Sequence, residues 1–326
     1  MSPFRRVTTV CSMLLVGSLT SAAPRVVARS SPGKTADACK ASTQAALHAC
    51  RAEAQSDKDL ALGKCANVPD VGAAKACDQQ ASLDAKDARA TCKDQHDARL
   101  AVCAKLGPGA YAPTIDPANF TDAMGNPLAI DNVLFPLSPG TTFVYEGQTA
   151  AGLEHDEFAV THNTRMILGV PCIEVHDTVT TGGVLTEDTL DWFAQDKAGN
   201  VWYFGENSKQ IEGGLVVGIE GTWTGGVDGA VPGIIMEAHP ALGDFYRQEF
   251  LLKDAEDVAE VASVDESVTL TNNNTTYPHC LKTTETSPLE PDALENKFYA
   301  PNVGNVLVVD VTAGEKSELV QVMTGP

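Results

Sequence analysis

The stretch DWFAQDKAGNVWYFGE (191–206) decides the fold of most of this 326-residue chain. Two aromatic-rich segments flank the turn sequence DKAGN (196–200), in which Gly199 tolerates the positive φ that a tight hairpin turn requires. Side chains alternate between the two faces of a strand. The pattern therefore predicts a β-hairpin with residues 191, 193 and 195 on one face and residues 192 and 194 on the other.

The same strand-like character continues through residues 107–326. Alternating and β-branched segments are separated there by Gly, Asn and Asp, and long helical patterns are nearly absent. Many short strands in one chain favour a mainly antiparallel sheet that is strongly curved, as a half-barrel or a barrel. The aromatic turn occurs once, so a propeller, which would repeat it, is excluded.

Residues 36–106 carry six cysteines in a symmetric pattern, with successive gaps of 11, 15, 12, 15 and 11 residues. The segment is rich in Ala, Lys, Asp and Gln, which predicts two helices joined by a turn at 67–72. At about 100° per residue, the cysteines of each helix stay on one stripe roughly 80° wide. Antiparallel packing of the two stripes predicts a hairpin with three disulfides: Cys39–Cys103, Cys50–Cys92 and Cys65–Cys77. The predicted fold class is thus α+β, a stapled helical hairpin followed by a curved antiparallel sheet.

The N-terminus reads as a secretory signal peptide over residues 1–23, with Arg5 and Arg6 before an apolar run and small residues at its end. Residues 24–35 form the predicted linker. The expected location is therefore secreted or periplasmic, and no membrane span is expected. In an oxidising compartment, the two cysteines outside the hairpin are expected to pair as Cys172–Cys280.

Charge divides the chain unevenly. Residues 108–326 contain 8 basic and 33 acidic residues, whereas the hairpin segment is nearly neutral and the whole chain carries a net charge of −20. A nucleic-acid partner is excluded because phosphate contacts need a basic face. The acidity suits solubility, cations or a cationic ligand.

Five strings resemble an exported bacterial β-domain family that is largely uncharacterised. The strings are FPLSPGTTFVYEG (135–147), EDTLDWFAQDKAGNVWYFGE (187–206), GVDGAVPGIIM (226–236), GDFYRQEF (243–250) and KFYAPNVGNVLV (297–308). Members of that family commonly read PGVG where this chain has PNVG (301–304). The last string is also similar to the final strands of LolA-like half-barrel carriers. The resemblance implies an exported β-domain and no particular activity, and the helical hairpin lies outside it.

The sequence contains candidate residues for acid–base catalysis and for binding of a small ligand. Carboxylates beside aromatic residues can form a buried acid–base pair. A curved sheet can line a ligand pocket with aromatic side chains. The catalytic candidates are Glu187, Asp191, Glu206, Asp228 and Glu249. The ligand-binding candidates are Trp192, Trp202, Tyr203, Trp223 and Tyr246.

A divalent metal is the third possibility, with copper favoured by imidazole and thioether ligands and calcium by oxygen-rich turns. The metal candidates are His155, His162, Met236 and His239. The Asp-containing turns DAMGN (122–126) and DKAGN (196–200) offer oxygen ligands without the spacing of an EF-hand. No cofactor is required by any motif.

The sequence therefore predicts a non-catalytic exported protein that binds a small ligand or another exported protein. Two alternatives stay open at this point: a carboxylate-dependent hydrolase or lyase in the β-domain, and a metal-binding protein.

Overall fold

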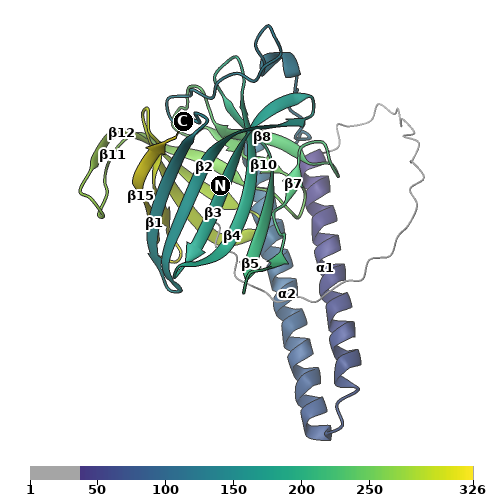
Figure 1. Ribbon diagram of the computed structural model, residues 1–326. Coiled ribbons are helices and arrows are strands. Elements are labelled where there is room, and N and C mark those ends of the chain that lie inside the picture. The colour runs from purple at the N-terminus through teal and green to yellow at the C-terminus, as the bar shows by residue number, and fades with distance from the viewer. Residues whose placement is uncertain (1–36, 326) are drawn as a thin grey trace, which may run out of the picture. The chain divides into compact units, whose positions relative to one another are not determined.

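The computed structural model describes residues 37–325, and the chain from Asp37 onward forms one compact unit. The predicted signal peptide (1–23) and linker (24–35) lie outside the described residues. The unit contains a helical hairpin and a single large antiparallel sheet (Figure 1), which confirms the predicted fold class.

The hairpin consists of α1 (Ala38–Cys65) and α2 (Val71–Leu106). Each helix starts at an aspartate whose side chain caps it: Asp37 accepts a hydrogen bond from Lys40 N and Asp70 from Ala73 N. Three disulfides cross between the helices with the predicted pairing, and their Cα–Cα distances are 5.5–5.7 Å. Two helices with so thin an alanine-rich seam gain their stability largely from these links. Among the described residues, no helix has the length and apolar character needed to span a membrane.

The sheet follows a meandering path in which most sequence neighbours pair directly. A short 3-10 helix, η1 (Pro117–Asn119), precedes it. The strands are β1 Thr141–Thr149, β2 Gly152–Ile167, β3 Val170–Thr181, β4 Val184–Gln195, β5 Val201–Glu212, β6 Leu215–Gly218, β7 Trp223–Thr224, β8 Val231–Met236, β9 Phe245–Arg247, β10 Glu249–Phe250, β11 Val258–Thr269, β12 Thr276–Ser287, β13 Glu290–Ala300, β14 Gly304–Asp310 and β15 Glu315–Thr324. Their order is β10-β8-β5-β4-β3-β2-β1-β15-β14-β13-β12-β11-β9, with β6 and β7 also paired to β5.

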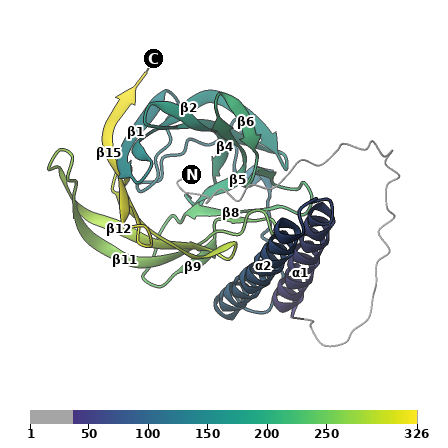
Figure 2. The ribbon, with the colours of Figure 1, turned by 90° about the horizontal axis from the view of Figure 1, so that it is seen from below.

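One segment, Phe245–Phe250, joins the two ends of this sheet. Its first half is β9, which pairs with β11, and its second half is β10, which pairs with β8. Gln248 lies between them and its backbone N–H donates to Asp257 O at 2.9 Å. The sheet is therefore nearly closed, and Figure 2 shows its strands curving around so that its two ends approach each other.

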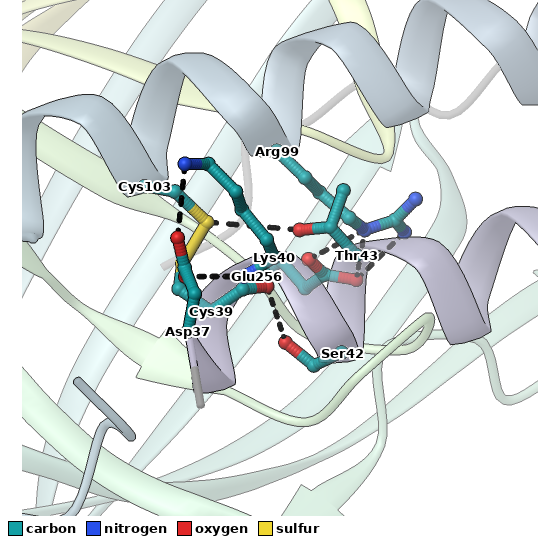
Figure 3. Close-up of a disulfide and its surroundings, with 8 residues drawn as sticks. All are labelled: Asp37, Cys39, Lys40, Ser42, Thr43, Arg99, Cys103 and Glu256. Carbon is teal, nitrogen blue, oxygen red and sulfur yellow. Dashed lines mark hydrogen bonds and ion pairs between the residues drawn. A yellow bond between two sulfur atoms is a disulfide. The ribbon is translucent and has the colours of Figure 1, made fainter. Parts of the chain in front are cut away.

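The hairpin docks on the loop that follows β10. Arg99 of α2 and Glu256 are both buried, and the guanidinium donates to both carboxylate oxygens at 2.7–3.0 Å (Figure 3). Glu256 also accepts from Lys253 N at 2.7 Å, and Lys253 pairs with Glu53 of α1. Gln95 donates to Leu289 O at 2.8 Å. A buried bidentate ion pair constrains the orientation of α2 on the sheet as well as its position.

The predicted Cys172–Cys280 disulfide is wrong, because both cysteines are free thiols that lie buried on distant strands. Cys172 is on β3 and Cys280 on β12, and β2, β1, β15, β14 and β13 separate them in the sheet. Cys172 belongs to a core on the outer face, with Ile167 and Trp192. A disulfide needs Cα atoms within about 7 Å, whereas each intervening strand adds about 4.8 Å.

We expect peptide mapping without reduction to find the three hairpin disulfides and two free thiols. Because Cys172 and Cys280 are buried, alkylation should label neither in the folded protein and both in denaturant, read by intact mass. The hairpin cysteines act as the internal control, since they should react only after reduction. A cross-linked 172–280 peptide would contradict the strand order.

Arg99→Ala should lower the free energy of unfolding by about 3–5 kcal/mol, because it leaves the Glu256 carboxylate buried without its partner. Lys93→Ala is the matched control on the same helix: its ion pair with Asp97 is exposed, so stability should hardly change. Equal effects of the two variants in urea unfolding would show that Arg99 does not anchor the hairpin.

Candidate functional site

The aromatic hairpin divides its side chains between the inside and the outside of the sheet, as its alternation predicts. Phe193 stacks on Tyr203 with ring centroids 4.8 Å apart. Phe135 contacts Phe193 of β4 and also Tyr299 of β13, which lies across the sheet. A residue can touch two such distant strands only from the concave side, so Phe193 and Tyr203 face the interior.

The opposite face of the same hairpin is covered by the segment that precedes the sheet. Trp192, Ala194 and Phe204 form the outer core together with Phe120, and Trp202 packs against it. Trp192 lies under the Arg165 guanidinium at 4.0 Å, and Trp202 donates its indole N–H to Asp196 at 2.9 Å. Two of the five predicted ligand-binding residues, Trp192 and Trp202, therefore face away from the interior.

Asp191 and Glu206 are directly opposite each other on β4 and β5 and both are buried. The Tyr203 hydroxyl donates to Asp191 Oδ1 at 2.5 Å. A bulge at Gly205 (φ 151°) brings Tyr203 and Glu206 to the same face. A Cβ at position 205 would lie 2.6 Å from Trp223 O, so only glycine fits there.

Glu249 and Trp223 complete the group that we call the Tyr203 cluster: Asp191, Tyr203, Glu206, Trp223 and Glu249. Trp223 pairs with Glu206 and packs edge-on against Tyr203 at 5.4 Å. Burial, and then the charges of Asp257 and Glu206, raise the pKa of Glu249 well above its usual range. Burial, and then the charges of Asp191, Glu206 and Glu249, likewise raise the pKa of Tyr203. Three predicted catalytic candidates thus surround one buried phenol.

A second pair of interior carboxyls, Asp156 and Asp177, was missed at the sequence level. Asp177 is 1% exposed, and the two side chains interact directly beside Tyr145. Burial raises the pKa of Asp156 to about 7, and burial and the Asp156 charge raise that of Asp177 well above its usual value. The signal in the sequence is V-H-D-T-V (175–179), in which an acid occupies the apolar face of an alternating strand without an aromatic neighbour.

A third polar group lies on β12 and β13, which we call the far wall of the sheet, and it includes a lysine. The Lys297 ammonium contacts Glu285 at 2.7 Å and Glu295 at 3.8 Å. Tyr299 and Thr283 donate to Glu285 at 3.3 and 2.8 Å. Burial raises the pKa of Glu295 to about 8, although the nearby Lys297 charge opposes this shift. Tyr246, a predicted ligand-binding residue, is buried close to Glu285.

Neither of the two remaining catalytic candidates is fully buried, although the charge of Glu187 contributes to the raised pKa of Asp156. Glu187 is half-buried and accepts a hydrogen bond from Thr189 at 2.9 Å. Asp228 is exposed in a turn with φ 51°. This is the left-handed backbone conformation, which Asp and Asn adopt more readily than most other residues.

The metal candidates lie on different elements. His155 on β2 is hydrogen bonded to Glu146 and Glu157 at 3.2 and 3.3 Å, and these bonds raise its pKa although partial burial opposes them. Met236 is fully buried on β8, whereas His162 and His239 are exposed. Within residues 37–325, no group of three His, Cys, Asp or Glu side chains has the arrangement of a metal site.

Both Asp-containing turns use their carboxylates to hold their own backbone. Asp196 accepts from Ala198 N, Asn200 N and the Asn200 amide, and Asp122 accepts from Met124 N, Asn126 N and the Asn126 amide. A shallow hollow of about 350 Å³, open to solvent, lies beside the turn at 196–200. Its polar lining is paired internally, for example through Gln195 Nε2 and Asp131 at 2.6 Å.

Comparison with known proteins gives little to set beside this geometry. No family model matches the chain, and no curated protein does. One solved structure, of a "putative lipoprotein" from Parabacteroides distasonis, aligns over 59% of this chain and 99% of its own, with 15% identity and a TM-score of 0.32. A superposition that loose carries no argument, so the resemblance to an exported β-domain family stays a prediction.

The protein should lose stability as the pH rises from about 5 to about 8.5. The pKa values of Asp156 (about 7) and Glu295 (about 8) in the folded state lie above their usual values of 3.8 and 4.5. Their contribution is therefore complete below the unfolded pKa and is lost as the pH rises through the folded one. Thermal unfolding in a pH series measures this effect.

Glu295→Gln should flatten that pH dependence, because the glutamine cannot ionise. Asp292→Asn, an exposed change on the same strand, is the control and should leave the slope unchanged. A midpoint that rises steadily from pH 5 to 8.5 would contradict the raised pKa values.

Proposed function

We propose that this protein acts outside the cytoplasm as a non-catalytic binding protein whose small ligand lies inside the curved sheet, against the Tyr203 cluster. The observation that carries the proposal is the convergence of three buried carboxylates on one tyrosine and one tryptophan. Aromatic faces with a few fixed polar groups are the usual lining of a small-molecule site.

The proposed location rests on the hairpin. Three disulfides in one short segment are typical of proteins that fold in an oxidising compartment and are rare in the cytosol. The predicted signal peptide agrees with this location. A second exported protein is the alternative partner, and it would contact the outer surface instead of the interior.

A hydrolase or lyase is the competing function, and one observation favours it. The pKa of Glu249 is raised, partly by the neighbouring Glu206, and two carboxyls with separated pKa values can act as acid and base. We favour binding because Asp191, the third carboxyl, is held by the Tyr203 hydroxyl at 2.5 Å, as expected for a fixed recognition surface.

The test is native mass spectrometry of the full chain purified from the organism that encodes it. We expect a bound small molecule that is retained in Asp228→Asn and lost in Glu249→Gln and Trp223→Leu. Asp228→Asn is the matched control, because Asp228 is exposed and asparagine tolerates its φ of 51°. Circular dichroism should show the same strand content in all four proteins.

Two outcomes would overturn the proposal. A protein that carries no small molecule in any preparation would remove the binding function. A turnover of any tested ester, glycoside or amide that is abolished in both Glu206→Gln and Glu249→Gln, with the fold intact, would replace binding with catalysis.

A further inference from the structure

We propose that strand β6 (Leu215–Gly218) is a docking edge for an extended segment of another protein, one that is aliphatic along its length and has a lysine or arginine near its end. The segment would pair with β6 and continue the sheet by one strand. This inference goes beyond the proposed binding of a small ligand and does not depend on it.

β6 is the second strand of a tight hairpin. Glu212 and Leu215 pair directly, so Gly213 and Gly214 alone form the turn, with φ values of 58° and 79°. Two-residue turns with positive φ at both positions are typical of β-hairpins. β6 pairs with β5 on one edge, and within residues 37–325 no strand pairs with its other edge. The backbone groups along that edge are therefore available to a further strand.

The side chains of β6 are exposed on both faces of the strand, although they are apolar. Leu215, Val216 and Val217 are 71, 56 and 54% exposed, and Ile219, just beyond the strand, is 63% exposed. A strand of an antiparallel sheet normally buries at least one of its two faces. A free edge with uncovered apolar side chains is what β-strand addition uses: backbone hydrogen bonds give affinity, and alternate side chains give specificity.

The chain protects another open edge and leaves this one unprotected. β11 pairs with β9 only over residues 258–260, and its continuation carries Asp265 and Glu266 and several register shifts against β12. Charges and bulges of this kind discourage pairing with strands of other molecules. Residues 213–219 (GGLVVGI), in contrast, contain no charged residue and no proline.

The residues at the end of β6 favour a basic partner. The Glu220 carboxylate and the side-chain oxygen of Gln210 both lie over Gly218, where a Cβ atom would collide with them. Gln210 Oε1 is buried, and the described residues give it no hydrogen-bond donor. An ammonium or guanidinium group placed over Gly218 would donate to both oxygens, and the bond to Glu220 would be charge-assisted. The 33 acidic and 8 basic residues of 108–326 also attract a cationic partner over longer distances.

A second copy of this chain fits the edge less well than a basic segment does. Residues 210–220 contain no Lys or Arg, so pairing of β6 with its own copy would leave Gln210 Oε1 without a donor. It would also bring two strongly acidic domains together, which costs electrostatic free energy.

The experiment uses the purified full chain and three fluorescein-labelled peptides, with binding read by fluorescence anisotropy. The probe is SKTVTVTKS, in which a lysine near each end serves either strand direction. One control is SETVTVTES, with reversed charges. The other is SKTPPVTKS, in which two prolines remove an N–H from each edge of the peptide. We expect the probe to bind at least about tenfold more tightly than either control.

Two matched pairs of variants locate the site. Val216→Lys should weaken probe binding at least about tenfold, because it adds a positive charge to the edge. Val184→Lys should leave binding unchanged, although the two valines are 56 and 58% exposed. Glu220→Gln should weaken binding of the probe about threefold and should not weaken binding of SETVTVTES. Glu212→Gln is its control, since Glu212 lies on β5 and β6 separates it from the docking edge.

Three results would overturn the inference: no binding of SKTVTVTKS, equal binding of SKTVTVTKS and SKTPPVTKS, or equal losses in Val216→Lys and Val184→Lys. Equal binding of SKTVTVTKS and SETVTVTES would show that the basic partner is wrong. A dimer in sedimentation experiments that Val216→Lys dissociates would instead assign the edge to a second copy of the chain. Circular dichroism of the four variants separates lost binding from lost folding.

Discussion

The pairing of Phe245–Phe250 with both ends of the sheet is the constraint on which the interior depends. A sheet that ends in two free edges exposes unpaired backbone groups and has an open concave face. Here β9 pairs with the edge strand β11, and β10 pairs with the edge strand β8. Both short strands lie within six consecutive residues, so one segment covers the two edges of the sheet. That closure places β8, next to the strand that carries Tyr203, and β11, next to the strand that carries Glu285, on one connecting segment.

The closed interior explains why its carboxyls behave as they do. Transferring a carboxylate out of water is costly, and buried acids respond by keeping their protons or by finding a cation. Both responses occur in this sheet: Glu285 has the Lys297 ammonium, whereas Asp156 and Glu249 have raised pKa values. Apolar residues of similar volume are often as stabilising as buried ionisable groups, so stability alone does not account for these carboxyls.

The sequence was sufficient for those parts of the structure that depend on local periodicity. The cysteine gaps follow from helix geometry, and the two faces of 191–195 follow from strand alternation, so both were predicted correctly. The Cys172–Cys280 disulfide was predicted wrongly. That prediction used only the even number of cysteines and the oxidising compartment, and neither of these shows which strands are neighbours. Alternation also separates two faces without saying which face is concave, so it did not show that Trp192 and Trp202 lie on the outer face. Asp156 and Asp177 come together through a diagonal register that only the assembled sheet specifies.

The hairpin matters to the interior through the same closing segment. Arg99 holds Glu256, which lies seven residues after Glu249, and Lys105 of the same helix contacts Glu260 and lies over the Phe245 ring at 4.7 Å. Contacts from α2 therefore flank the segment that carries Glu249 on both sides. The Cys39–Cys103 disulfide ties α1 to this part of α2, next to Arg99 (Figure 3). The disulfides thus matter beyond the hairpin, since one of them links α1 to the part of α2 that contacts the chain on both sides of Glu249.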